Sequence, residues 1–301
     1  MPALNTGAAR KIVGGEIPSL TSVAFCLEDS ILDSQLAEAE EKLSLILADL
    51  AAVGKDRLPL VFVRVRTPEH LLLVAEKYAA YAEIITGYVL PKFDTSNMER
   101  YLRTAETLPG AWGKAYLMPT LESGGIAGSS MRREALREIK AALGGVHERV
   151  MNVRVGGNDL CNLYGVRRNV TQTIYDVGVV RDILVDILNV FSPDYVVSGP
   201  VWEYFGGAGW EEGLRRELEL DRLNGFVGKT AIHPAQLPVI YEAMKVRRSD
   251  YDDALRILGW SEGSLAVAKS GDGSRMNEVK CHARWAQRVA ALGSIYGIRE
   301  T

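Results

Sequence analysis

The sequence predicts a (β/α)₈ barrel over residues 1–249, followed by a helical extension over residues 250–301. Short apolar runs rich in β-branched residues recur along the chain, and a polar or glycine-rich segment closes each run. The polar ends lie roughly 30 to 40 residues apart, which is the length of one strand, one helix and their loops. We expect strands within residues 22–29, 59–65, 83–92, 115–122, 150–159, 195–201 and 228–234.

Segments between these runs have the composition and spacing of helices. Residues 32–53 and 130–143 are rich in helix formers and repeat apolar residues at helical spacing. Strands that alternate with helices lie parallel, because each helix returns the chain to the same end of the sheet. A barrel needs eight strands, so one more is expected before residue 20, where only "MPAL" and "KIVGG" are available. That first strand is either very short or truncated, and a doubly wound open sheet stays the alternative.

The C-terminal part of the chain extends beyond the expected barrel. A helix over residues 236–246 would complete the barrel. Beyond it the sequence predicts a helix over 250–258, a flexible loop over 270–277 and a helix over 278–292. Such an extension would serve as a lid or as an arm between subunits.

Composition excludes several classes of protein. With 301 residues, of which 47% are hydrophobic, the chain can bury a large core. Its net charge of −3 is spread along the chain without a basic block, which argues against a nucleic-acid partner. Three cysteines without paired spacing argue against a disulfide framework or a zinc site. No apolar stretch predicts a signal peptide or a membrane span, so we expect a cytoplasmic protein without a membrane partner.

Two carboxylates end consecutive predicted strands, at Glu122 and Asp159. In parallel α/β folds the carboxyl ends of the strands form the active site, so both side chains are expected on one rim. Two carboxylates, with water and a chelating substrate, fit the oxygen shell that Mg²⁺ prefers. The nearby Gly124, Gly156 and Gly157 would let a substrate approach closely. The alternative is that both acids cap helices.

Other polar strand ends supply candidate catalytic groups. Arg64 could bind a substrate carboxylate through paired hydrogen bonds or could serve as a structural ion-pair partner. Glu28 and Asp29 could hydrogen-bond metal-bound water or cap the following helix. Lys92 is expected to pair with these acids and stay charged, which disfavours a Schiff-base role. His233 is a candidate general base, although a packed, hydrogen-bonded role is favoured.

Six segments in the same order and spacing resemble one family. "FCLEDSI" resembles "DLEDAV", "VFVRV" resembles "VRVN", and "VLPKF" resembles "LPKV" of the citrate lyase β-subunit and malyl-CoA lyase group, within the HpcH/HpaI aldolase superfamily. "TLESGG" is similar to its "IET" segment, "VGGNDL" to "GxxDL", and "GFVGKTAIHPAQL" to "GFDGKWAIHPAQ". The resemblance covers about residues 20–240. Segments such as "GPVWEYFGG" resemble a less studied branch of TIM-barrel C–C bond lyases.

The resemblance implies a TIM barrel with Mg²⁺ held by Glu122 and Asp159, and with Arg64 binding the substrate anion. It also implies a homo-oligomer, a trimer or a hexamer, in which the C-terminal segment covers a neighbour's site. Three departures stand out. A first-strand segment with its arginine is absent, Arg66 stands where the Asn of "VRVN" would lie, and the extension lacks the segment that bears a catalytic Asp in malyl-CoA lyase.

The leading hypothesis is an Mg²⁺-dependent lyase that breaks or forms a carbon–carbon bond on a 2-oxo acid, with an acyl-CoA as a candidate partner substrate. Glu28, Asp29 and Arg64 are its predicted catalytic residues, and Asp272, Glu278 and His282 are candidates for proton transfer. One alternative is a barrel enzyme for phosphoenolpyruvate-like or phosphonate substrates, with Arg167 and Arg168 on the phosphate. The other is a non-catalytic binding component of a complex.

Overall fold

The computed structural model describes residues 1–108, 113–260 and 265–300. The chain forms two compact units, Met1–Leu237 and Pro238–Thr301, and each is described by itself. The division into a catalytic domain of residues 1–249 and an extension of residues 250–301 stays a prediction.

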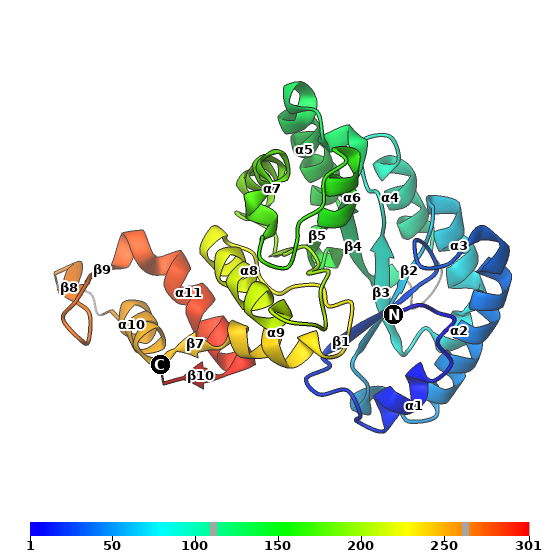
Figure 1. The fold of residues 1–301 in the computed structure, drawn as a ribbon, viewed down its shortest axis with the longest axis horizontal. Helices are drawn as coiled ribbons and strands as arrows, with labels where there is room; N and C mark the ends of the chain where they lie inside the picture. Colours follow the sequence, from blue (N-terminus) through cyan, green and yellow to red (C-terminus); the bar gives the residue numbers. More distant parts are fainter. Residues whose placement is uncertain (109–112, 261–264, 301) are drawn as a thin grey trace. The chain divides into compact units, whose positions relative to one another are not determined.

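A curled parallel sheet forms the centre of the first unit (Figure 1). Its six strands are hydrogen-bonded in chain order, and every neighbouring pair is parallel. They are β1 (Ser22–Cys26), β2 (Leu60–Arg64), β3 (Ile85–Leu90), β4 (Tyr116–Leu121), β5 (Val153–Val155) and β6 (Val197–Ser198).

Two isolated parallel bridges extend this order at both edges of the sheet. Pro2 pairs with Cys26 of β1, and Lys229 pairs with Gly199 just after β6. The expected first strand is therefore a single bridge within "MPAL", whereas "KIVGG" contributes to helix α1 (Ala8–Val13). The run over residues 228–234 is likewise reduced to one bridge. Eight parallel segments in chain order give the strand order of a (β/α)₈ barrel.

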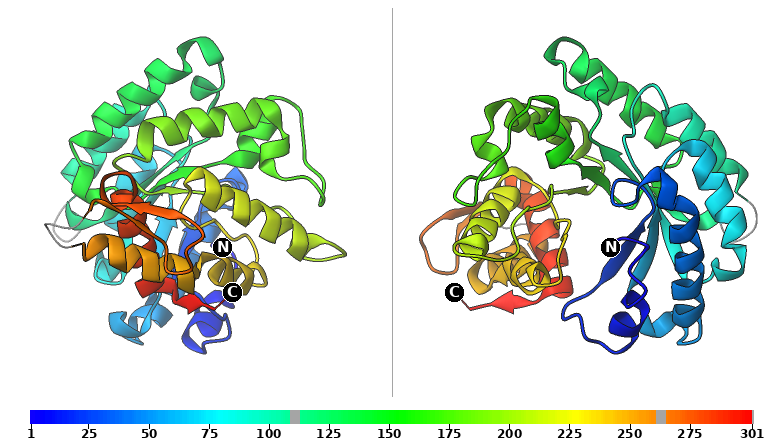
Figure 2. Two further views of the ribbon diagram at one scale, coloured as in Figure 1. Left: turned by 90° about the vertical axis from the view of Figure 1, so that its left-hand side faces the viewer. Right: turned by 45° about the vertical axis from the view of Figure 1, so that its right-hand side comes forward.

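Helices cover the outer face of the sheet (Figures 1 and 2). In α2, Leu43, Ile46, Leu47 and Leu50 recur at helical spacing and are buried against the sheet. Helix α3 begins with a Thr67 cap that accepts a hydrogen bond from the His70 N–H. The helices are α2 (Leu36–Ala51), α3 (Pro68–Lys77), α4 (Met98–Thr107), α5 (Ser129–Gly144), α6 (Gly157–Leu163), α7 (Gly178–Phe191) and α8 (Trp210–Asn224).

Alternation along the strands decides which side chains enter the barrel. In β2, Val61 and Val63 belong to the large core under the helices, while Phe62 joins a small inner cluster with Val89 and Met118. Successive strand residues point to opposite faces, so Arg64 is the next inward side chain after Phe62. The inner face thus changes from apolar side chains to charged ones toward the carboxyl ends of the strands.

The second unit packs two helices around a small apolar core. Helix α9 (Gln236–Met244) leads into β7 (Val246–Arg247), which pairs in parallel with β10 (Ile298–Arg299). Helices α10 (Arg248–Leu258) and α11 (Val279–Tyr296) enclose a core of Val246, Ala254, Ile257, Ala286 and Val289.

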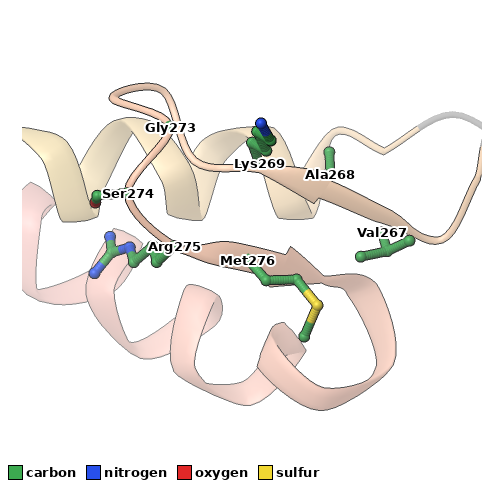
Figure 3. Close-up of a pocket in the computed structure, with 7 residues that line it drawn as sticks. All are labelled: Val267, Ala268, Lys269, Gly273, Ser274, Arg275 and Met276. Carbon is green, nitrogen blue, oxygen red and sulfur yellow. The ribbon is translucent and has the colours of Figure 1, made fainter.

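The segment expected to be a flexible loop is the turn of a β-hairpin. Strands β8 (Val267–Lys269) and β9 (Met276–Glu278) pair antiparallel on either side of it. Arg275, just before β9 in Figure 3, forms ion pairs with Asp250 and Asp253, and its guanidinium lies 5.3 Å from the ring centre of Trp285. These contacts tie the turn to both helices. Residues 270–275 form the expected loop, but the prediction missed that Met276 and the residue after it belong to a strand, and that the flanking segments pair.

Within the described ranges, every helix is too short or too polar to cross a lipid bilayer.

Candidate active site

Arg64 brings three of the predicted acids together at the carboxyl end of β2. Its Nη2 lies 2.6 Å from Glu28 Oε2, 2.9 Å from Asp29 Oδ2 and 2.9 Å from Glu122 Oε1. These carboxylates raise the pKa of Arg64 although its burial acts in the opposite direction. Arg64 is therefore the ion-pair partner that one interpretation expected, and it stands at the predicted site.

Lys92 completes the network from the loop after β3. Its Nζ lies 2.7 Å from Glu28 Oε1 and 3.0 Å from Asp29 Oδ1, as expected for a lysine among acids. Burial opposes its charge, but the two carboxylates raise its pKa above the ordinary value. A lysine held in its charged form is a poor nucleophile. Glu28 and Asp29 are thus held by Arg64 and Lys92.

Glu122 is the most deeply buried acid of the site, at 3% exposure. Its Oε1 accepts hydrogen bonds from Arg64 Nη2 and, at 3.0 Å, from the backbone N–H of Lys92. Lys92 has a positive φ of 50° in this arrangement. Burial raises the pKa of Glu122 to about 7; Arg64 opposes this shift and the charge of Asp159 adds to it. The short helix after Glu122 has Ser123 as its cap residue, so Glu122 is not a helix cap.

Asp159 lies in the first turn of α6, where Gly156 is the cap residue. Burial raises the pKa of Asp159, and the negative charge of Asp29 adds to the shift. In the described part of the chain its carboxylate forms no ion pair with a lysine or arginine. Asp159 and Glu122 therefore lie in one region, where the charge of Arg64 opposes the rise in pKa of both carboxyl groups.

The predicted glycines have three different surroundings. A Cβ at Gly156 would lie 2.0 Å from Glu122 Oε2, so only glycine leaves room for this carboxylate. A Cβ at Gly157 would lie 2.7 Å from the Pro200 side chain, which indicates packing against the loop after β6. At Gly124 the space is open. Of the three, Gly156 alone touches a predicted metal ligand.

The residues present fit a divalent cation held by two carboxylates. In the described residues, no group of three or more His, Cys, Asp or Glu side chains is arranged to hold a metal. Mg²⁺ commonly binds through one or two carboxylates and completes its shell with water and substrate oxygens. A cation beside Glu122 and Asp159 would offset the repulsion and burial that raise both pKa values. Glu122 Oε2, on the Gly156 side, is the oxygen not engaged by Arg64 or Lys92.

Arg66, the departure from the family pattern, holds the loop that carries Glu28 and Asp29. Its Nε and Nη2 each donate at 2.6 Å, to the carbonyl oxygens of Leu27 and Ile31, and Nη1 pairs with Asp33. The side chain therefore closes the 27–33 loop around itself. Sequence reasoning noted Arg66 only as a replaced asparagine.

Arg154 is a site residue that sequence reasoning missed. It stands on β5 between Val153 and Val155, which are buried in the outer core, so it faces the barrel interior. Burial lowers the pKa of Arg154 to about 10, and the charge of Arg64 adds to the shift. The signal was available: an arginine alternates with valines in "VRVGG" and shares its face with Gly156.

Other candidates lie in different settings. His233 is exposed, accepts a hydrogen bond from the Ala235 N–H and stacks on Phe205 with ring centres 4.5 Å apart. Arg168 is buried over Trp202 and pairs with Glu217, so it is not free to bind a phosphate. In the second unit, Asp272 accepts hydrogen bonds from Ser270 and Ser274 within the hairpin turn, which lower its pKa.

Comparisons with known proteins agree with this fold. A family model described as C–C bond lyase of the TIM-barrel fold matches residues 1–298. No curated protein matches the chain in sequence. The structure of CitE from Mycobacterium tuberculosis with magnesium, acetoacetate and coenzyme A is similar, with 19% identity, a TM-score of 0.66 and coverage of 98% of this chain and 96% of that one.

Two further solved structures share the architecture. A second CitE structure from Mycobacterium tuberculosis, with magnesium and pyruvate, has 21% identity and a TM-score of 0.57, covering 81% of this chain and 88% of that one. A citrate lyase from Burkholderia xenovorans LB400 has 14% identity and a TM-score of 0.70, covering 98% and 90%. At these identities the likeness shows a TIM-barrel-like fold, as the strand rhythm predicted.

Proposed function

The chain belongs to the family of C–C bond lyases of the TIM-barrel fold, and we propose that it breaks or forms a carbon–carbon bond on a 2-oxo acid with Mg²⁺ held by Glu122 and Asp159. An acyl-CoA is the proposed partner substrate. We keep a homotrimer or hexamer and a cytoplasmic location as parts of the same proposal.

The observation that carries this proposal is the surroundings of Glu122. One carboxylate oxygen is fixed by Arg64 and the Lys92 N–H, and the other lies against Gly156, where any side chain would displace it. A purely structural buried acid gains nothing from a neighbouring unpaired carboxylate such as Asp159. Burial raises the pKa of both acids, and the charge of Asp159 adds to the rise at Glu122, so the two carboxylates are suited to sharing a cation.

When bound, Mg²⁺ would act as a Lewis acid that stabilises negative charge on the oxygens of a 2-oxo acid. The chain's own residues orient that substrate. Arg64, at 19% side-chain exposure, can donate to a substrate carboxylate or to the oxygen on which charge develops. Glu28 and Asp29 keep Arg64 and Lys92 in place and can accept hydrogen bonds from water near the cation.

Known structures of the same fold support the choice of substrate class. CitE from Mycobacterium tuberculosis has been crystallised with magnesium and pyruvate, and with magnesium, acetoacetate and coenzyme A. The buried position of Arg168 removes one of the two arginines that a phosphate-binding alternative requires. We therefore favour a carboxylate substrate over a phosphorylated one.

The metal assignment can be tested without knowing the substrate. Titration calorimetry of the full chain with Mg²⁺ should give one site, and Glu122→Gln and Asp159→Asn should each weaken it at least about tenfold. Glu69→Gln, at an exposed ion pair with Arg100, is the matched control and should bind Mg²⁺ normally. Unchanged Mg²⁺ affinity in both site variants would rule the assignment out.

The reaction is tested by incubating the protein and Mg²⁺ with pairs of 2-oxo acids and acyl-CoAs, with proton NMR following both carbon–carbon bond formation and cleavage. We expect turnover with at least one pair, and loss of that turnover in Glu122→Gln. A protein that binds 2-oxo acids yet turns over no pair would instead support a binding role.

A further inference from the structure

Arg154 lies on β5, and its guanidinium faces the barrel interior with only part of its hydrogen-bond donors paired in the described chain. Its Nη2 donates to Thr230 Oγ1 at 2.8 Å. Across residues 1–108, 113–260 and 265–300, no carboxylate lies within ion-pair distance of it, whereas Arg64 and Lys92 are each paired with at least two. Among the described residues, its Nε and Nη1 have no hydrogen-bond partner.

Strand register and the hydrogen bond to Thr230 together place this guanidinium near the level of Glu122. Arg154 pairs with Ser198, and Lys229 pairs with Gly199, the residue just after β6. Thr230 is therefore two residues beyond the row of Arg154, toward the carboxyl ends of the strands. Gly156, which touches Glu122, lies the same two residues beyond Arg154 on its own strand.

The surroundings of Arg154 are polar rather than apolar. Thr120, its register partner on β4, is buried with its hydroxyl oxygen lacking a hydrogen-bond partner in the described chain. Ser198 flanks Arg154 on the other side. A guanidinium surrounded by hydroxyl groups and without a carboxylate partner is suited to binding an anion with two oxygens.

We infer that Arg154 binds a second anionic group on the 2-oxo acid, so that the enzyme prefers a 2-oxo acid carrying an extra carboxylate or phosphonate over a simple one. This inference rests on the proposed function, because the keto-acid end is taken to lie at Glu122 and Asp159. Arg64 would hold the first carboxylate and Arg154 the second. Thr230 orients Arg154 for this contact.

Three ligands that differ only at one end test the inference: pyruvate, freshly dissolved oxaloacetate and phosphonopyruvate, each titrated calorimetrically into the full chain with saturating Mg²⁺. We expect at least one dianionic ligand to bind about tenfold to a hundredfold more tightly than pyruvate. Preference for oxaloacetate identifies the second group as a carboxylate, and preference for phosphonopyruvate identifies it as a phosphonate.

Arg154→Gln should reduce the affinity for the preferred ligand to that for pyruvate and leave pyruvate binding unchanged. Thr230→Val, which keeps the side-chain shape, should lose part of the preference, and Arg100→Gln on the surface should lose none. Equal binding of all three ligands by the unmodified protein would overturn this inference alone. Absence of pyruvate binding at saturating Mg²⁺ would instead overturn the proposed function.

Discussion

Arg64 Nη2 donates to Glu122 Oε1 across 2.9 Å, and this bond joins the ends of β2 and β4 inside the barrel. The two residues are 58 positions apart in the chain. Because Glu122 is buried, its charge depends on this guanidinium, and Arg64 in turn aligns two further acids. The bond therefore links the stability of the site to its chemistry.

Replacement of Arg64 should separate these two roles. Arg64→Met leaves buried Glu122 and Glu28 without their shared cation, so we expect a lower melting temperature and a loss of pyruvate affinity of about tenfold to a hundredfold. Arg64→Lys should recover the melting temperature more fully than the affinity, because lysine lacks the planar fork. Differential scanning fluorimetry and calorimetry measure the two quantities. Equal recovery of both by lysine would argue against paired recognition.

Two glycine substitutions form a matched pair. A methyl group at Gly156 must displace Glu122 Oε2, so Gly156→Ala should weaken Mg²⁺ binding at least about tenfold. Gly124→Ala meets open space and should leave the affinity unchanged. Calorimetric Mg²⁺ titration of both variants makes the comparison. A normal Mg²⁺ affinity in Gly156→Ala would contradict the placement of the metal at this oxygen.

Arg66 should act through the loop that it holds. Arg66→Ala removes donors to Leu27 and Ile31, so we expect faster amide exchange over residues 27–33 and weaker pyruvate binding. Arg57→Ala, in the short helix before β2, is a control away from this loop. Hydrogen-exchange mass spectrometry reports the first effect. Unchanged exchange over 27–33 would show that the loop holds itself in place.

A second buried ion network should govern the stability of the first unit. Lys229 Nζ lies 2.8 Å from both Glu217 Oε1 and Asp221 Oδ2, and all three side chains are fully buried. Lys229→Met removes the cation that two buried acids share and leaves Asp221 without an ion-pair partner in the described chain, so it should cost about 3–5 kcal/mol in the free energy of unfolding. Chemical denaturation measures this cost, and the near-neutral control is Arg103→Met, which removes an exposed ion pair with Glu99 within one helix. A cost below 1 kcal/mol, roughly that of a surface pair, would contradict a buried network.

Asp253 should make the hairpin of the second unit sensitive to acid. Burial opposes its charge, but the Gly271 N–H, Arg275 and Asn277 lower its pKa below the usual range. A carboxyl group whose pKa is lower in the folded state stabilises that state above about pH 4. This contribution to stability is lost as the pH falls through the lowered pKa. At neutral pH, Asp253→Asn should therefore speed amide exchange over residues 267–278 by about tenfold. If the variant and the unmodified protein exchanged these amides at the same rate, the hydrogen bonds of Asp253 would not be what stabilises the turn.

The sequence by itself determined the order of strands and helices, and with it the rim on which Arg64, Glu122 and Asp159 meet. It could do so because strand and helix periods are local, and parallel strands all end at one edge. Six matching segments also indicated the family, and the match of a family model to residues 1–298 confirms it.

Only the tertiary structure decided how the site is connected. One nitrogen of Arg64 serves three carboxylates, Gly156 touches Glu122, and Arg154 reaches Thr230 across two strands. Each of these contacts joins residues far apart in sequence, and each depends on the curl of the sheet and on rotamers that no local period specifies. The hairpin over residues 267–278 formed for the same reason: its strands are stabilised by pairing with each other, and neither short segment predicts a strand alone.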